Sequence, residues 1–444
     1  MRPRFRSDSW YLVALFVTLI SLGSILLVLP VSQAENELKK QPVSYVDALF
    51  MATSAVCVTG LATVDLSRFS HFGQVVLLLL IQFGGLGVIS FTSLLLILPG
   101  GRIPFRRIST IRSFYVDGVE YDPRRILLTI VGTTLLIEAL GAVVLSLLFK
   151  QAGVQNYVFS GIFHAVSAFC NAGFSLFSDS LEGFSRNPMV LLVIMLLIIL
   201  GGLGFIVIQD IDQRMRRKRR YLNYHSKVVL GMTAVLIALG FLVYFFFEEN
   251  SSFSGFPLKD RIVNALFQSV TPRTAGFDTV PQSMLSQPSK VFTILLMFIG
   301  AGPGSIAGGI KVSTIFIIII LMIRHPDSAG DIQIGKHRIT GYTLNRATVY
   351  FLKALSLLLA GALMLSLIEG PRGAAFDKIV FEVVSAFGTV GLSLGITPEL
   401  SVAGKLVIIG IMFAGRIGLV ALSFSLVHVK KYDITYPEGT VLLG

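Results

Sequence analysis

Four short stretches ending in glycine recur along the chain and offer the same backbone chemistry. They are Ser54–Leu61, Ser167–Phe174, Val270–Phe277 and Ser385–Leu392. Their glycines stand at 60, 173, 276 and 391, at intervals of 113, 103 and 115 residues. Glycine adopts backbone conformations closed to other residues, so its carbonyl can point where theirs cannot. If four such turns met on one axis, their carbonyl oxygens would replace the hydration shell of a cation.

The candidate ion ligands are the glycine of each turn and the two residues before it. They are Val58, Thr59, Gly60, Asn171, Ala172, Gly173, Thr274, Ala275, Gly276, Thr389, Val390 and Gly391. The third stretch, with Arg273 before its Thr-Ala-Gly, lacks the serine that the other three carry six residues before the glycine. The cysteines Cys57 and Cys170 both lie three residues before a turn glycine, so their place in the repeat explains them better than a disulfide or metal site.

A second glycine mark follows each turn, at Gly84, Gly201, Gly300 and Gly415, which is 24, 28, 24 and 24 residues later. Self-similarity at this period indicates four copies of one unit. The chain of 444 residues is 54% hydrophobic and only 14% charged, whereas a soluble protein carries about a quarter charged residues. The composition therefore predicts a membrane protein with many spans.

Each unit reads as a long helix, a short re-entrant helix, a loop and a second long helix. The expected long helices are 10–29, 72–98, 126–149, 188–208, 228–247, 291–323, 349–368 and 402–427, and the short ones are 45–56, 157–169, 261–270 and 376–387. This is an all-α membrane protein of four helix–pore-loop–helix repeats, with eight transmembrane helices around a central pore. The repeat boundaries we expect are 1–100, 101–212, 213–325 and 326–444. Trp10–Leu29 is long for a signal peptide and lacks a cleavage site, so we interpret it as a retained span.

Orientation follows from the positions of lysine and arginine. The basic residues gather between the units and in the tail, at 102–125, 214–227, 324–346 and 430–431. Basic residues flanking spans mark the cytoplasmic side, so both termini and all three linkers are expected there, in a plasma (inner) membrane protein. The net charge of +12 is explained by topology and anionic lipid rather than by nucleic acid.

The long helix of the third unit is interrupted by a run rich in glycine. Proline removes a backbone donor and each glycine costs about 1 kcal/mol, so this run cannot stay helical. From the residues alone, one interpretation of this run is a kinked packing helix. The other, a gate below the turns, is what the family resemblance given below implies, and its candidate residues are Gly300, Gly302, Pro303, Gly304, Ser305, Gly308, Gly309, Lys311 and Arg416. A phosphate-binding loop is excluded because Lys311 comes one place late and no strand precedes the run.

Together these motifs resemble the membrane subunit of the Trk/Ktr/HKT superfamily of potassium transporters, of the Ktr type. The marks are Val56–Leu61, Gln82–Gly87, Thr271–Phe277 and Gly300–Lys311, and the resemblance extends from Trp10 to the C-terminus. The Trk type carries two extra N-terminal spans, so the Ktr type fits better. The resemblance implies potassium uptake, a preference for potassium because glycine stands in all four turns, an intramembrane gate, and Arg416 in the pore facing it. It also implies a homodimer seated on a cytosolic ring of nucleotide-binding regulatory subunits, with nucleotide on the partner only and no bound cofactor.

Four ionisable residues at membrane depth have competing interpretations. Arg416 either pairs with an acid such as Glu382 or faces the gate, and Lys311 either snorkels or belongs to the gate. We interpret Glu138 as a structural partner rather than an ion site, and Arg273 as a brace for the third turn rather than a contact of the ion. The regulatory ring is expected to dock around 214–220 and 336–346, and the apolar tail 436–444 hints at a subunit contact.

The alternatives belong to other classes. An ion-coupled cotransporter of another small solute would fit inverted repeats, but these units all run in one direction. A membrane enzyme would need a cluster of catalytic side chains at one depth, which six histidines and the scattered acids do not supply. We therefore expect no enzyme activity.

Overall fold

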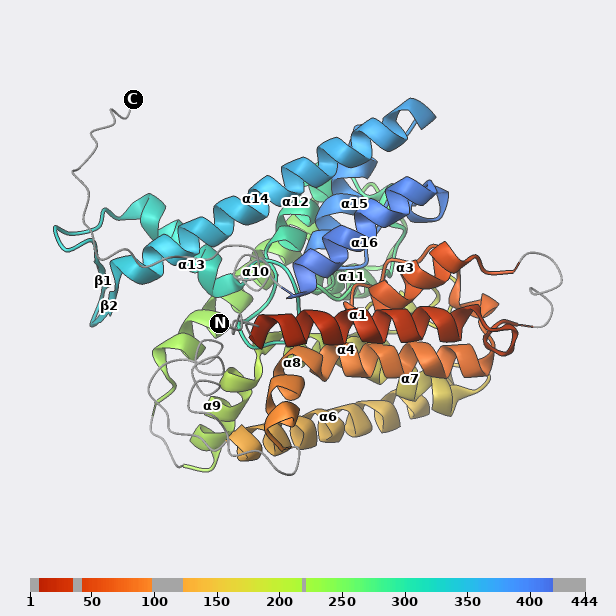
Figure 1. Cartoon of the computed structure of the whole chain (residues 1–444), viewed down its shortest axis with the longest axis horizontal. Helices are drawn as coiled ribbons and strands as arrows, with labels where there is room; N and C mark the ends of the chain where they lie inside the picture. The colour runs from red at the N-terminus through yellow and green to blue at the C-terminus, as the bar shows by residue number, and fades with distance from the viewer. Residues whose placement is uncertain (1–7, 35–41, 98–122, 218–220, 418–444) are drawn as a thin grey trace, which may run out of the picture.

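The computed structural model describes residues 8–34, 42–97, 123–217 and 221–417, and these are mostly helical (Figure 1). The first unit comprises α1 (Asp8–Val28), α3 (Tyr45–Val56) and α4 (His71–Ile97). The second comprises α6 (Pro123–Gln151), α7 (Tyr157–Phe169), α8 (Pro188–Leu203) and α9 (Phe205–Met215). The third comprises α10 (Tyr224–Phe247), α11 (Leu258–Val270), α12 (Gln287–Phe298) and α13 (Val312–Ile323). The fourth comprises α14 (Gly341–Glu369), α15 (Phe376–Gly388) and α16 (Val402–Ile417). Several single turns of 3-10 helix join them.

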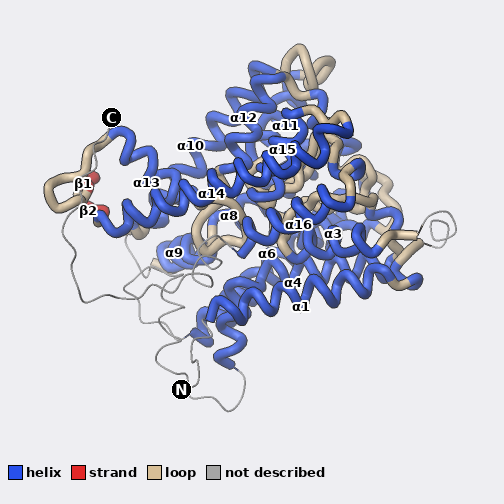
Figure 2. The backbone as a smooth tube through the Cα atoms, turned by 45° about the horizontal axis from the view of Figure 1, so that its top comes forward, coloured by secondary structure: helices blue, strands red, loops and turns tan. Residues whose placement is uncertain are grey.

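The long and short helices alternate as the repeat predicts, and the glycine-rich run separates α12 from α13 where the sequence indicates a break (Figure 2). One expectation is wrong. We predicted an unbroken helix over 188–208, but α8 and α9 meet at a bend of 101°. The pivot is Gly204, whose φ of +91° takes it out of helical conformation. The amide that follows it, Phe205 N, donates to Gly304 O at 3.2 Å, so tertiary contact fixes the bend.

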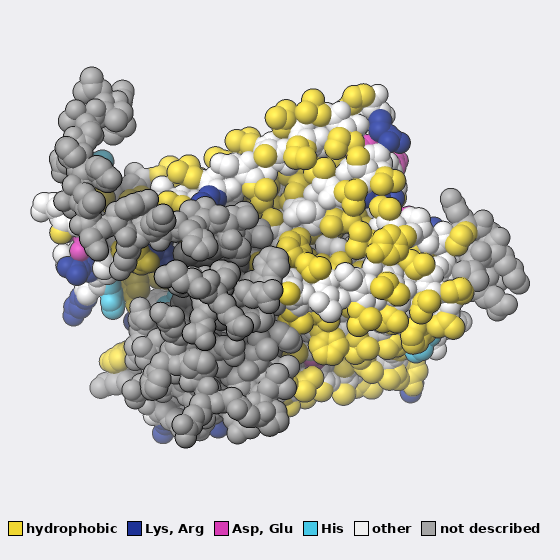
Figure 3. Space-filling model, in the orientation of Figure 1, with side chains coloured by type: hydrophobic (Ala, Val, Ile, Leu, Met, Phe, Trp, Pro, Cys, Tyr) yellow, Lys and Arg dark blue, Asp and Glu magenta, His cyan; other side chains and the backbone are white. Residues whose placement is uncertain are grey.

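Apolar side chains cover the outside of the helices. Figure 3 shows hydrophobic side chains spread over much of the described face, and on α6 the side chains of Leu136, Leu140 and Leu147 are exposed. Among the described residues, three helices are long and apolar enough to cross a membrane, over 128–151, 224–247 and 341–372, or four if the bent pair α8–α9 is one span. That all eight long helices cross remains a prediction.

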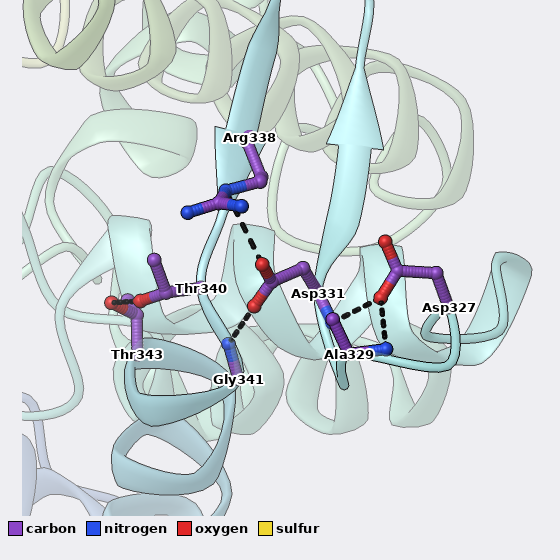
Figure 4. Close-up of polar contacts among 7 residues, drawn as sticks. All are labelled: Asp327, Ala329, Asp331, Arg338, Thr340, Gly341 and Thr343. Carbon is purple, nitrogen blue, oxygen red and sulfur yellow. Dashed lines mark hydrogen bonds and ion pairs between the residues drawn. The ribbon is translucent and has the colours of Figure 1, made fainter.

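A small hairpin joins the third unit to the fourth. Strands β1 (Ile332–Ile334) and β2 (His337–Ile339) are antiparallel, with Ile332 opposite Ile339. Asp331 holds it in place, since its carboxylate pairs with Arg338 Nε at 3.2 Å and accepts from Gly341 N at 2.8 Å at the start of α14 (Figure 4). Asp327 Oδ1 accepts from the amides of Ala329 and Asp331 at 3.0 and 2.9 Å. The sequence predicts only a basic linker here.

Several sequence expectations fall outside the described residues. These are the basic cluster at 102–125, except for the helical backbone of 123–125, residues 218–220 of the second basic linker, residues 418–427 of the expected last helix, and the basic and apolar tail at 430–444. The orientation argument therefore rests on the sequence.

Candidate functional site

The four short helices form a closed ring through their neighbours. Each packs against the first long helix of its own unit, in the pairs α1 with α3, α6 with α7, α10 with α11 and α14 with α15. Each also packs against the last long helix of the preceding unit, in the pairs α4 with α7, α8 with α11, α12 with α15 and α16 with α3. The fourth unit thus closes onto the first, and the four turns after the short helices face one another.

The second glycine mark has a packing reason in three units. A Cβ on Gly84, Gly201 or Gly415 would overlap the backbone carbonyl four residues before the turn glycine, which belongs to Val56, Phe169 and Phe387 respectively. Glycine therefore lets the long helix touch the C-terminal end of the short helix. In the third unit the equivalent turn position is Pro272. Gly300 instead lies against Gly308 O, within residues 300–310, which we call the broken segment.

All four turns have positive φ at the same two positions. The residue two places before each glycine has a positive φ, which is uncommon outside glycine. These residues are Val58 at 55°, Asn171 at 53°, Thr274 at 72° and Thr389 at 50°. The glycines follow with φ of 93°, 69°, 73° and 99°. Four non-glycine residues held in this region by one repeated geometry point to a functional constraint on the turns.

The four glycines touch around the ring. A Cβ on Gly60 would lie 2.5 Å from Ala172 O and 3.1 Å from the Gly173 Cα. A Cβ on Gly173 would lie 2.8 Å from Ala275 O and 3.1 Å from the Gly276 Cα. The same overlap repeats from Gly276 onto Val390 O and from Gly391 onto Thr59 O, which closes the circle. A side chain at any of the four positions would strike a carbonyl oxygen of the next unit.

A buried hydroxyl fixes each turn. Gly60 N donates to Ser54 Oγ and Gly391 N donates to Ser385 Oγ, both at 3.1 Å. Ser167 Oγ donates to Phe174 O and Thr271 Oγ1 donates to Phe277 O, both at 2.7 Å. Thr271 stands five residues before its glycine rather than six, so a one-residue shift hides it from the serine pattern. The third unit has this hydroxyl after all.

The side chains at the positive-φ positions are polar in three units. The Asn171 amide nitrogen donates to the carbonyls of Ala168 and Ile198 at 3.0 and 3.2 Å, and its oxygen faces the Thr274 hydroxyl. Thr389 Oγ1 is buried, has no hydrogen-bond partner among the described residues and lies beside Gly308 of the broken segment. Thr59 Oγ1, next to its turn glycine, is likewise buried and unpartnered in the part of the chain that the structure describes.

The broken segment lies against all three other units. Its Ile306 side chain is within 3.3 Å of a Cβ placed on Gly85 of α4, and Gly308 lies against Thr389 of the fourth turn. Gly302 N donates to Gly202 O of α8 at 2.9 Å. The broken segment therefore contacts each of the other three units close to the ring of turns.

Two basic side chains hold the second half of this segment. Arg416 NH1 donates to Ile306 O, and its NH2 donates to Gly84 O at 2.5 Å and Gly85 O at 3.3 Å. Lys311 Nζ donates to Ala307 O at 2.5 Å. Glu382 does not pair with Arg416, since its carboxylate accepts from the hydroxyls of Ser393 and Thr397. Of the two interpretations of Arg416, the geometry matches the one in which it faces the broken segment.

The other ionisable groups at depth contact protein. Glu138 accepts from Gln82 Nε2 at 3.1 Å, and the Cys170 thiol lies 3.6 Å from it. Arg273 is buried and donates to Thr233 Oγ1 of α10 at 3.3 Å. It occupies the place held by Cys57, Cys170 and Gly388 in the other turns, and both cysteines are free thiols. No group of three His, Cys, Asp or Glu side chains within the described ranges could hold a metal.

The structure thus brings together all twelve predicted turn residues in one ring and all nine predicted gate residues beside it. Sequence reasoning missed Ser54, Ser167, Thr271 and Ser385 as supports of the turns, and it missed Gly201, Gly202 and Gly204 as partners of the broken segment. The serines carried a signal in the repeat itself. Gly201 stands at the second glycine mark of its unit, but nothing in the sequence indicates that it, Gly202 or Gly204 contacts the broken segment.

Comparison with known proteins places the chain among transporters. Residues 2–432 match the TrkH family, described as "Cation transport protein". The chain is 37% identical to the "Ktr system potassium uptake protein B" of Bacillus subtilis, covering 99% of this chain and 97% of that one. It is 36% identical to the "Potassium/sodium uptake protein NtpJ" of Enterococcus hirae, covering 100% and 99%. Its fold resembles the crystal structure of the potassium transporter TrkH from Vibrio parahaemolyticus, with a TM-score of 0.74, 22% identity and coverage of 96% of this chain and 86% of that one.

Proposed function

Because the chain belongs to the TrkH family of cation transport proteins, a family of membrane ion transporters rather than enzymes, we propose that it carries potassium ions into the cell through its ring of four turns. The observation that carries the proposal is the mutual contact of Gly60, Gly173, Gly276 and Gly391. Each glycine lies beside a backbone carbonyl of a neighbouring unit, and we propose that these four carbonyls surround a common axis. Ions of the alkali metals bind such rings because carbonyl oxygens replace their water.

The short helices add to the attraction. Each ends a few residues before its turn, so the partly negative C-terminal end of α3, α7, α11 and α15 lies next to the ring. Non-helical backbone at membrane depth is tolerated where it lines a water-filled path. The unpartnered hydroxyls of Thr59 and Thr389 fit such a path. In this proposal the twelve turn residues form the selectivity filter.

Potassium is the favoured cargo because glycine in all four turns gives a ring of equivalent carbonyls. The names of the relatives support it, since one is a potassium uptake protein and another a potassium/sodium uptake protein. Because the second name includes sodium, we also propose that potassium uptake by this chain depends on sodium. An organic solute is less favoured, because the four turns pack so closely that a Cβ added to any ring glycine would overlap a carbonyl oxygen of the next unit.

The broken segment serves as the gate. It lies across the axis, and Arg416 puts a fixed positive charge beside it, which opposes a passing cation. Glycine and Pro303 deprive it of helical hydrogen bonds, so it can change conformation at low cost. Opening then requires release of Ile306 from Arg416 and of Ala307 from Lys311.

The relative from Bacillus subtilis is named as one protein of a Ktr "system", which supports an assembly with a partner subunit. We propose a homodimer in the plasma membrane, with both termini in the cytoplasm, controlled by a cytosolic ring of nucleotide-binding subunits. The exposed Arg216 and the hairpin residues Lys336 and Arg338 face outward, where a soluble partner could bind. We propose four units with the boundaries expected from the sequence, 1–100, 101–212, 213–325 and 326–444.

Growth and flux test the proposal together. The chain, with and without a regulatory subunit, should restore growth at low potassium to cells that lack potassium uptake. The purified protein in liposomes should carry potassium down its gradient. Failure in both assays by folded, inserted protein would reject the proposal, and uptake of an organic solute instead would support the cotransporter.

A further inference from the structure

The broken segment is hydrogen-bonded along its first half to the bend between α8 and α9. Three amide-to-carbonyl contacts join the two, from Gly302 to Gly202 at 2.9 Å, from Phe205 to Gly304 at 3.2 Å and from Ile306 to Gly201 at 3.5 Å. The two interruptions, in the second and third units, therefore satisfy each other's backbone groups. Neither would stay open alone, because unpaired backbone groups in a membrane are costly.

Glycine permits this contact on both sides. A Cβ on Gly204 would lie 2.5 Å from Pro303 O, and one on Gly302 would overlap Leu203 O. Gly204 also has a φ of +91°, which an L side chain rarely adopts. The bend thus depends on Gly204 for both its conformation and its close approach to the broken segment.

Helix α9 continues from this bend and packs against α10. Val207 of α9 and Val229 of α10 are fully buried in one cluster with Leu203. The buried Asp210 carboxylate accepts from Asn223 N at 2.8 Å and from Asn223 Nδ2 at 3.1 Å, just before α10. Beyond these contacts α9 ends at Met215, followed by the exposed Arg216 and Arg217. The basic linker is therefore one short helix away from the broken segment.

We propose that α9 and its Gly204 bend form the second half of the gate, a positioning element that holds residues 301–306 across the axis and couples them to the linker after α9. This rests on the proposed function, because it assigns a role at the same gate. Movement of α9 away from α10 would break the contact from Phe205 to Gly304 and withdraw the support of the broken segment. Ile306 would then keep only its hydrogen bonds with Arg416 and with Gly201 O of α8.

The test compares potassium flux of three variants in liposomes. Gly204→Ala disturbs the bend itself, and Asp210→Ala removes the link from α9 to Asn223 while leaving the pore untouched. Gly231→Ala on α10 is the matched control, since a Cβ there meets nothing within 4 Å. A hydrogen bond to a charged group corresponds to about a tenfold change in an equilibrium. We expect potassium flux about tenfold higher in the first two variants, with potassium-over-sodium preference unchanged, and wild-type flux in the control.

A purely structural role would lower flux or leave less folded protein, which gel filtration and thermal unfolding reveal. If Gly204→Ala does not fold, Asp210→Ala decides the question. Folded Asp210→Ala with the flux of Gly231→Ala would overturn the coupling, while wild-type potassium flux would leave the proposed function standing. Absence of wild-type flux would instead reject the proposed function.

Discussion

Serine substitutions in the ring test the filter, and the structure ranks them. An L residue at positive φ costs roughly 1–2 kcal/mol, and overlap with a packed neighbour adds about 1–3 kcal/mol. Gly391 has a φ of +99° and a Cβ there would overlap Thr59 O, so Gly391→Ser should bear both costs. Gly173 has a φ of +69°, inside the left-handed region, and its nearest contact is looser, 2.8 Å from Ala275 O. Gly173→Ser should therefore disturb the ring least.

If this cost weakens the binding of potassium at the carbonyl ring relative to that of sodium, the preference for potassium decreases about tenfold for each 1.4 kcal/mol. We expect a loss on the order of a hundredfold, or no flux, in Gly391→Ser and a smaller loss in Gly173→Ser. Flux of each ion into liposomes under competition measures it. Gly153→Ser is the matched control, because Gly153 has a φ of +78° but a Cβ there meets nothing within 4 Å. Wild-type preference in all four ring variants, or a loss in the control equal to theirs, would refute the filter.

Three further predictions concern the gate, the partner and pH. Deletion of Ala301–Ala307 should raise potassium flux several-fold without changing ion preference, and Arg416→Ala should do the same. Unchanged or lower flux in folded forms of both variants would favour the other interpretation of the broken segment, a kinked packing helix. A nucleotide-binding regulatory ring should change the flux of the chain in liposomes, because it can shift the gate only by binding open and closed forms unequally; flux identical with and without the ring, across nucleotides, would contradict this. Glu248, just past the end of α10, accepts from Ser286 N at 3.0 Å and Ser252 Oγ at 2.7 Å. Burial raises the pKa of its carboxyl, but the hydrogen bonds from Ser286, Ser289 and Ser252 outweigh burial and hold the pKa below its ordinary 4.5. The stability it contributes is complete above pH 4.5 and is lost as pH falls through the lower folded pKa. In thermal unfolding, the wild type should therefore lose more stability below pH 4.5 than Glu248→Gln does. Parallel plots of stability against pH for the two proteins would contradict this contribution of Glu248.

The turns could be predicted from the sequence because their chemistry is local and repeated. A glycine at matched intervals, with a second glycine after it, reports a backbone requirement that no other residue meets. The structure gives that requirement its cause, which is the contact of Gly84, Gly201 and Gly415 with carbonyls of the short helices. Thr271 escaped notice because a hydroxyl can reach the same carbonyl from a position one residue later.

The bend at Gly204 could not be predicted, because its cause is tertiary. Residues 188–208 are continuously apolar, and a glycine in an apolar helix is common in membranes. Only the approach of Pro303 and Gly304, a hundred residues later in sequence, turns Gly204 into a break. The choice between Glu382 and the broken segment as partner of Arg416 was open for the same reason. The hairpin at 332–339 is too short for its alternating isoleucines to stand out.

Anomalous scattering from rubidium tests the central claim most directly. Rubidium resembles potassium in charge and size, and crystals of the protein grown in its salt would reveal where the ion binds. The account predicts a peak on the axis of the ring, between carbonyl oxygens contributed by all four units, namely those of Thr59, Ala172, Ala275 and Val390. Crystals of protein that carries rubidium in liposomes, yet show no peak on that axis, would contradict it.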